Sequence, residues 1–172
     1  MSKMKVLFAA SEAAPFITTG GLGEVAGSLP KALKSKYRND LDIRVILPLY
    51  QSIAERNGFE FVGKTTVPLA WRQQYCGVFK KTVNDVTYYF IDNEYYFKRN
   101  DCYGHFDDGE RFAFFSKAVL FILPMLGFIP DIIHSNDWQT ALVPVYLKTI
   151  YSSSADYNNI NPVFTIHNKE YQ

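Results

Sequence analysis

The chain has 172 residues, of which 48% are hydrophobic and 16% aromatic, so it is long enough to bury the core of one globular domain. Its 18 basic and 17 acidic residues give a net charge of +1 and are scattered along the chain. This distribution excludes the basic surface that binds nucleic acid or an anionic membrane, so we expect neither partner.

The cysteines and the N-terminal residues indicate in which cellular compartment the protein is expected. Cys76 and Cys102 match neither a zinc motif nor a disulfide framework, which predicts free thiols and no bound metal. The first apolar run is short and is interrupted at Ser11 and Glu12, unlike a signal peptide. Residues 112–129 contain a serine, a lysine, a proline and a glycine, which indicates a core helix and not a membrane span. These features predict a cytoplasmic protein.

The N-terminal part of the chain has the pattern of a βαβ unit. Residues 6–10 are continuously apolar, which predicts a strand buried on both faces, as in a parallel sheet. A glycine-rich loop follows at residues 18–25, and apolar residues at helical spacing then continue to about Ser35. Residues 43–47 predict a second strand, which Pro48 ends.

The middle of the chain has a different character. Residues 59–67 and 74–91 are rich in Val, Thr, Tyr and Phe, and Asn84 and Asp85 predict a hairpin turn, so we expect a β insertion that leads back to the main sheet. Residues 92–109 are polar and aromatic, and their apolar residues follow neither the spacing of a helix nor the alternation of a strand. This is typical of a long functional or disordered loop. Their aromatic content argues against disorder.

The C-terminal part returns to alternating helices and strands. The expected elements are a helix at 110–126 capped by Gly127, a strand at 131–135, a helix from its N-cap Asp137 to about Ile150, a loop at 151–161 and a strand at 162–167. This alternation predicts an α/β fold with a doubly wound, mostly parallel sheet.

The glycine loop is the first candidate ligand site. Gly20, Gly21 and Gly23 remove Cβ atoms where the backbone has to turn sharply, so a ligand can approach the main chain. Amide groups at the start of the following helix favour phosphate or another anion, by about 0.3–1 kcal/mol at an exposed site. The loop matches neither a Walker motif nor the full dinucleotide fingerprint. Phosphate binding and a plain connection therefore remain equal alternatives at this point.

Polar side chains also follow several predicted strands, where ligands collect in doubly wound sheets. They are Ser11, Glu12, His134, Asn136, Asp137, His167 and Asn168. Glu12 also fits a solvated loop acid, His134 a core histidine and Asp137 a simple helix cap. Their joint placement favours a functional site. The sequence offers no nucleophile with a partnered base and no paired-carboxylate spacing, so it predicts a domain that binds a phosphorylated or sugar-like ligand.

Several motifs carry a family resemblance. They are SEAAPF at 11–16, TGGLGEV at 19–25, LP at 29–30, VILP at 45–48, ERF at 110–112, IHSNDW at 133–138 and FTIHN at 164–168. In this order along the whole chain, they resemble the N-terminal domain of bacterial glycogen synthase and starch synthase. The resemblance implies the Rossmann-like N-terminal half of a GT-B glycosyltransferase. It further implies a retaining transfer of glucose from ADP-glucose to the non-reducing end of an α-1,4-glucan, with no metal and no cofactor.

The resemblance also implies residue roles. His167 and Asp137 are the implied catalytic residues, with His167 contacting the transferred glucose and Asp137 holding an acceptor hydroxyl or orienting its neighbours. The implied substrate-binding residues are Thr18, Thr19, Gly20, Gly21, Tyr103 and Asn168. The glycine loop is expected to lie against the donor phosphates and the acceptor end.

The chain departs from the family pattern in two ways. Thr18 stands where the family has a lysine, and a hydroxyl cannot supply the charge that lysine offers to a phosphate, so we expect weaker donor affinity or turnover. The sequence also ends soon after the His-Asn motif. We therefore expect residues 1–172 to be a truncated catalytic domain that lacks the C-terminal nucleotide-sugar-binding domain and is inactive alone.

Two other functions stay open. One is a different GT-B glycosyltransferase that uses another sugar nucleotide. The other is a non-catalytic module that binds an α-glucan or a nucleotide, which Thr18 favours.

Overall fold

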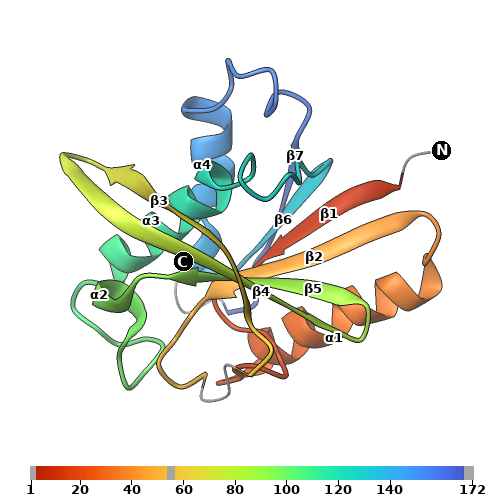
Figure 1. The fold of residues 1–172 in the computed structure, drawn as a ribbon, viewed down its shortest axis with the longest axis horizontal. Coiled ribbons are helices and arrows are strands. Elements are labelled where there is room, and N and C mark those ends of the chain that lie inside the picture. Colours follow the sequence, from red (N-terminus) through yellow and green to blue (C-terminus); the bar gives the residue numbers. More distant parts are fainter. Residues whose placement is uncertain (1–2, 54–56, 169–172) are drawn as a thin grey trace.

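A computed structural model describes residues 3–53 and 57–168. Its centre is a seven-stranded sheet with the order β3-β4-β5-β2-β1-β6-β7 (Figure 1). The strands are β1 Met4–Ala9, β2 Leu41–Pro48, β3 Glu60–Leu69, β4 Arg72–Val83, β5 Val86–Asp92, β6 Ile132–Asn136 and β7 Asn161–Thr165. Neighbouring strands from β5 to β7 are parallel, whereas β3 and β4 pair in antiparallel fashion. The predicted mostly parallel α/β sheet is confirmed.

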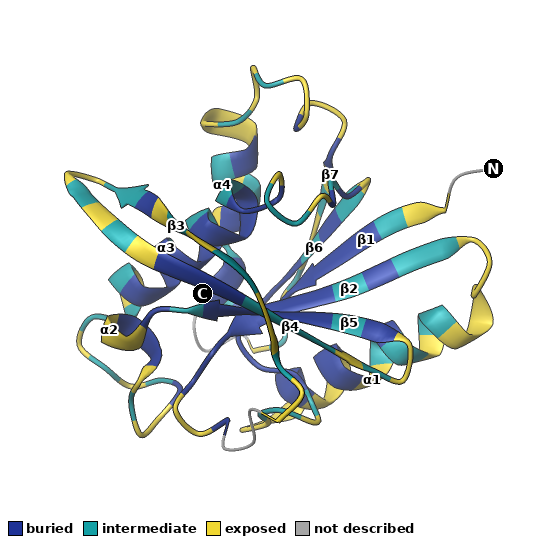
Figure 2. Ribbon diagram, viewed as in Figure 1, coloured by how far each residue is buried: buried dark blue, intermediate teal, exposed yellow. Residues whose placement is uncertain are grey.

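The helices lie on both sides of this sheet. From β1 the chain crosses to β2 through α1 Gly21–Lys36, and from β5 it crosses in the opposite direction to β6 through α3 Asp108–Phe121. Connections between parallel strands are right-handed. Because the two connections run in opposite directions along the sheet, α1 lies on one face and α3 on the other. The last helix, α4 Leu142–Thr149, packs beside α3 (Figure 1). Figure 2 shows the buried residues concentrated in the central strands and on the inner sides of these helices.

The predicted β insertion is also present. β3, β4 and β5 form an antiparallel unit whose β5 joins the parallel sheet beside β2. Asn84 and Asp85 connect β4 to β5 with φ angles of 51° and 64°. Two successive positive φ values are those of a type I′ turn, which matches the right-handed twist of the two strands.

The start of α1 corrects the expected role of the glycines. The helix begins at Gly21, inside the predicted loop, and Gly20 is its N-cap with an extended φ of −168°. Neither Gly21 nor Gly23 has a positive φ. The expectation of a sharp turn at these glycines was therefore wrong, because they form the first helical turn.

Three other boundaries differ from the sequence-based expectations. α3 ends at Phe121, because Pro124 has no N–H to donate to the Leu120 carbonyl. This carbonyl accepts from the Leu123 amide at 3.2 Å and from the Tyr157 hydroxyl at 2.9 Å. Turns then continue to Gly127, which has a φ of 57°. The helix predicted after Asp137 is divided into a 3-10 helix, η1 Trp138–Thr140, and α4. The long loop contains a short helix, α2 Glu94–Phe97.

α1 packs so closely against the preceding loop at Gly27 that a larger residue there should destabilise the fold. A Cβ atom on Gly27 would lie 2.6 Å from the Ala14 carbonyl oxygen and 2.7 Å from the Ala14 Cβ. We expect Gly27→Ala to lower the free energy of unfolding in urea by about 1–3 kcal/mol, as overpacked sites do. The matched control is Gly109→Ala in α3, where nothing lies within 4 Å and alanine should stabilise by up to about 1 kcal/mol. Equal midpoints for both variants would contradict this packing.

Candidate functional site

A cavity of about 890 Å³ lies beyond the carboxyl ends of β1, β6 and β7. This volume is in the range of small-molecule sites, and its position is that of ligand sites in doubly wound sheets. The cavity is lined by Glu12, Thr19, Gly20, Gly21, Leu22, Val25, Tyr103, Gly104, Asp108, Asp137, Trp138, Gln139, His167 and Asn168.

Most of the residues predicted for the site are brought together here. Those that line the cavity are Thr19, Gly20, Gly21, Tyr103, Asp137, His167 and Asn168. Thr18 is exposed and does not line it; it covers Gly23, where an added Cβ would lie 2.9 Å from the Thr18 Cα. The roles predicted for these residues stay predictions.

The N-terminus of α1 opens into the cavity. Gly20 offers no side chain to cap the first amide groups of the helix. A Cβ on Gly20 or Gly21 would meet nothing within 4 Å, so the backbone is open to an approaching ligand. The free N–H groups and the helix dipole make this wall suitable for an anion such as phosphate.

Glu12 joins two loops that line the cavity. Its side chain is 3% exposed, so it is not a solvated loop acid. The carboxylate accepts hydrogen bonds from the Thr19 amide, from the Thr19 hydroxyl at 3.0 Å and from the Tyr103 hydroxyl at 3.0 Å. These partners satisfy most of its lone pairs. Glu12 therefore positions the glycine segment relative to the loop that carries Tyr103.

Tyr103 lines the cavity, and its hydroxyl is held by buried partners. Its hydroxyl also forms a 2.7 Å hydrogen bond with the Ser11 hydroxyl. Burial and the adjacent Glu12 carboxylate raise the pKa of Tyr103 well above its ordinary value, so it remains protonated. Its ring centroid lies 6.2 Å from that of Trp138, which forms part of the same wall.

Asp137 connects the end of β6 to η1. Its carboxylate accepts a 3.0 Å hydrogen bond from the Trp138 amide, which confirms a capping role, although the capped element is η1. Its own amide donates to the Thr165 carbonyl at 2.8 Å. The backbone has a φ of 63°, which is unfavourable for a residue other than glycine and is common at functional sites.

His134 supports the site without lining the cavity. Its Nε2 atom lies 2.7 Å from the Thr165 hydroxyl, and its ring centroid lies 4.6 Å from that of Phe8. Burial lowers the pKa of His134, which favours the neutral imidazole. The structure therefore favours the core-histidine interpretation for this residue.

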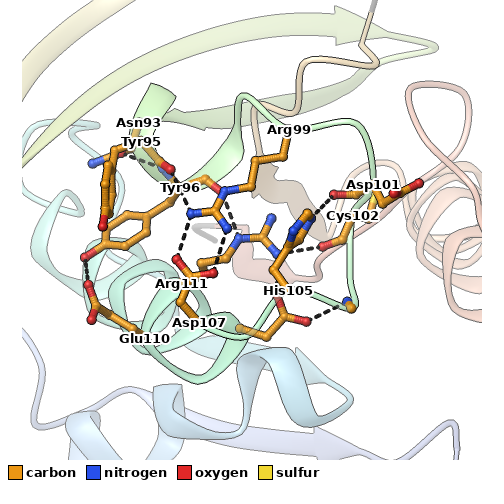
Figure 3. A network of polar contacts seen from close by, with 12 residues as sticks. Asn93, Tyr95, Tyr96, Arg99, Asp101, Cys102, His105, Asp107, Glu110 and Arg111 are labelled. Atoms are coloured by element: carbon orange, nitrogen blue, oxygen red, sulfur yellow. Dashed lines mark hydrogen bonds and ion pairs between the residues drawn. The ribbon is translucent and has the colours of Figure 1, made fainter.

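Arg111 and its neighbours hold the loop that delivers Tyr103 (Figure 3). The fully buried guanidinium donates to the Tyr96 carbonyl at 2.7 Å, to the Cys102 carbonyl at 3.1 Å and to the Asp108 carboxylate. This role was not predicted from the sequence. One feature of the sequence could have indicated it: Arg111 lies four positions before Phe115, on the apolar face of the predicted helix. A charged side chain on a buried face needs a buried partner.

A second ion pair, between Arg99 and Asp107, also holds this loop (Figure 3). Arg99 binds Asp107 in bidentate fashion at 2.6 and 2.7 Å. The hydrogen bonds from Arg99 lower the pKa of Asp107, so this carboxylate stays ionised at neutral pH. The loop predicted as long and functional is therefore ordered by two arginines.

Within 3–53 and 57–168, no group of three or more His, Cys, Asp or Glu side chains is placed to hold a metal ion. No helix in this part of the chain is long and apolar enough to cross a membrane. Cys76 and Cys102 are free and buried.

Comparison with known proteins explains this combination of fold and cavity. Residues 5–172 match the family model of the starch synthase catalytic domain. The chain belongs to this family. It is 52% identical over 171 residues to the glycogen synthases of Alkaliphilus metalliredigens and Geobacillus stearothermophilus. In both alignments 98% of this chain and 35% of the relative are covered, so the chain spans about a third of the length of these starch synthase family members.

A solved starch synthase structure supports the same assignment. The catalytic domain of starch synthase IV from Arabidopsis thaliana, bound to ADP and acarbose, superposes with a TM-score of 0.88 at 32% sequence identity. The alignment covers 99% of this chain and 35% of that chain. The expected fold, one half of a GT-B glycosyltransferase, is thereby confirmed.

Proposed function

We propose that residues 1–172 are the N-terminal Rossmann-like domain of a glycogen or starch synthase. The complete enzyme transfers glucose from ADP-glucose to the non-reducing end of an α-1,4-glucan with retention of configuration. The observation that carries this proposal is the convergence of the α1 N-terminus, Tyr103, Asp137 and His167 on one cavity in a member of this family. The ADP and acarbose bound by the Arabidopsis relative support nucleotide and glucan as the ligand classes.

Each wall of the cavity has a chemical task in this reaction. The open amides of Gly20 and Gly21 face the charge that develops on the donor phosphates. His167 and Asp137 line the same cavity and meet the sugar hydroxyls, and the rings of Tyr103 and Trp138 exclude water.

We further propose that a C-terminal domain closes the cavity and supplies the basic residues for the diphosphate. Its place is indicated by the edge strand β7, where Val163 and Phe164 are 43% and 42% exposed, and by Ile166 just after it, which is 49% exposed. The 35% coverage of the relatives supports a larger enzyme. Residues 1–172 alone should be inactive, because one half of the cleft cannot provide all the charge stabilisation. The cytoplasmic location stays a prediction.

A transfer assay tests this function and the role of Thr18. We expect the protein extended by a C-terminal domain, such as that of the Geobacillus enzyme, to incorporate glucose from ADP-glucose into glycogen, and the 172-residue chain not to. Thr18→Lys in the extended protein should raise kcat/KM about tenfold, because one phosphate contact of ~1.4 kcal/mol is gained.

The matched control is Thr18→Gln, which lengthens the side chain without a charge and should leave kcat/KM near that of the parent. Efficient transfer by the 172-residue chain would refute its proposed dependence on a second domain. Glucan binding without turnover in every extended form would instead support the binding module, the alternative that Thr18 favours.

A further inference from the structure

Asn136 has a side-chain amide whose orientation is set by its surroundings. The residue is 1% exposed, and its Nδ2 atom lies 3.2 Å from the Ala9 carbonyl oxygen and 3.0 Å from the His134 carbonyl oxygen. Carbonyl oxygens only accept hydrogen bonds, so the NH₂ group must face them. The opposite orientation would place three oxygen atoms together in a buried space and leave the NH₂ group without these acceptors.

The orientation of Asn136 determines what His167 can do. With the NH₂ group committed to the two carbonyls, Oδ1 of Asn136 faces Nε2 of His167 at 3.1 Å. An amide oxygen cannot donate, so Nε2 must carry the hydrogen of this bond. In the neutral imidazole, Nδ1 then has no proton and can only accept.

We propose that Asn136 is a positioning residue that holds His167 in the Nε2–H tautomer, so that His167 meets its ligand through Nδ1 as a hydrogen-bond acceptor. His167 lines the cavity, whereas Asn136 lies behind it and does not. The ligand group that pairs with Nδ1 is therefore a donor, such as a hydroxyl. That this hydroxyl belongs to a sugar rests on the proposed function, whereas the tautomer is a property of the chain alone.

Nitrogen NMR of the ¹⁵N-histidine-labelled 172-residue chain tests the assignment without any ligand. The chain has three histidines, and His105→Gln and His134→Gln variants identify the His167 signals. In the neutral imidazole of His167, we expect a protonated Nε2 and an unprotonated, acceptor-type Nδ1. A predominantly protonated Nδ1 in the wild-type chain would overturn the proposal.

Variants at position 136 test whether Asn136 is the cause. Asn136→Ala should move the His167 nitrogen shifts toward the average of the two tautomers, while the His134 signals and the circular dichroism spectrum report that the fold is kept. Asn136→Asp places a carboxyl oxygen against the Ala9 and His134 carbonyls, so this carboxyl should bind a proton and donate to them. Its other oxygen still accepts, so Nε2–H of His167 should persist. Unchanged His167 shifts in a folded Asn136→Ala chain would overturn the proposal. If Asn136→Ala does not fold, a predominantly protonated Nδ1 of His167 in Asn136→Asp would overturn it.

These outcomes are separate from those of the transfer assay. A confirmed Nε2–H tautomer in an enzyme that transfers no glucose would reject the proposed function and leave the role of Asn136 intact. Glucose transfer by an enzyme whose His167 carries its proton on Nδ1 would reject the role of Asn136 alone.

Discussion

Replacing Arg111 by methionine is expected to lower the free energy of unfolding by about 3–5 kcal/mol, the usual cost of removing one partner of a buried ion pair. The guanidinium is fully buried and donates to the Asp108 carboxylate and to the carbonyls of Tyr96 and Cys102. Methionine fills much of the volume of the side-chain stem but satisfies none of these acceptors. Urea unfolding of the 172-residue chain measures the difference.

The loss should be concentrated around the loop that carries Tyr103, and hydrogen exchange at residues 98–108 should accelerate more than in the central strands. The matched control is Arg38→Met, because Arg38 pairs with Asp85 at 3.0 Å while the two side chains are 74% and 68% exposed. Such an exposed pair contributes about 0–1 kcal/mol. Similar losses in both variants would show that the buried contacts of Arg111 are not the cause.

Replacing Glu12 by alanine is expected to reduce glucose transfer by the extended enzyme about 10- to 100-fold, equivalent to ~1.4–2.8 kcal/mol. The carboxylate holds Thr19 and Tyr103 from its buried position between two segments of the cavity wall. Without it, neither the α1 amides nor Tyr103 is kept in place for the ligand. The kcat/KM for ADP-glucose at saturating glycogen measures the effect.

Two further variants separate positioning from charge. Glu12→Gln should lose less than alanine, because the amide oxygen accepts from the Thr19 N–H and both hydroxyls can turn to accept from the NH₂ group. Glu24→Ala removes an exposed acid of the same helix end that does not line the cavity, and it should leave kcat/KM nearly unchanged. An active Glu12→Ala enzyme with normal protection of the Thr19 amide would contradict the positioning role.

The fold was largely predictable from local patterns. The apolar runs that predicted strands at residues 6–10 and 43–47 correspond to β1 and β2, and the turn at Asn84 and Asp85 joins β4 to β5. Such features depend on neighbouring residues alone. The end of α3 was missed because the helical pattern of apolar residues continues past Pro124, although the helix itself ends at Phe121.

The candidate site was predictable in position but not in its internal contacts. Parallel strands end at the same edge of a sheet, so Asp137 and His167 were expected together from topology, and both line the cavity. Tyr103 was proposed only from the family resemblance, because residues 92–109 have no helical or strand periodicity from which its position could be predicted. Thr18, also from that resemblance, lies outside the cavity lining.

The sequence by itself determined the order of strands and helices, the mostly parallel sheet and the edge at which polar side chains gather, because apolar periodicity and turn residues act over a few positions. Only the tertiary structure decided that Glu12 is buried, that it binds Tyr103 91 positions away and that Asn136 faces His167 31 positions away. The physical reason is that a buried polar group takes its partner from whichever segment packing brings within hydrogen-bond distance, and sequence spacing does not encode that distance.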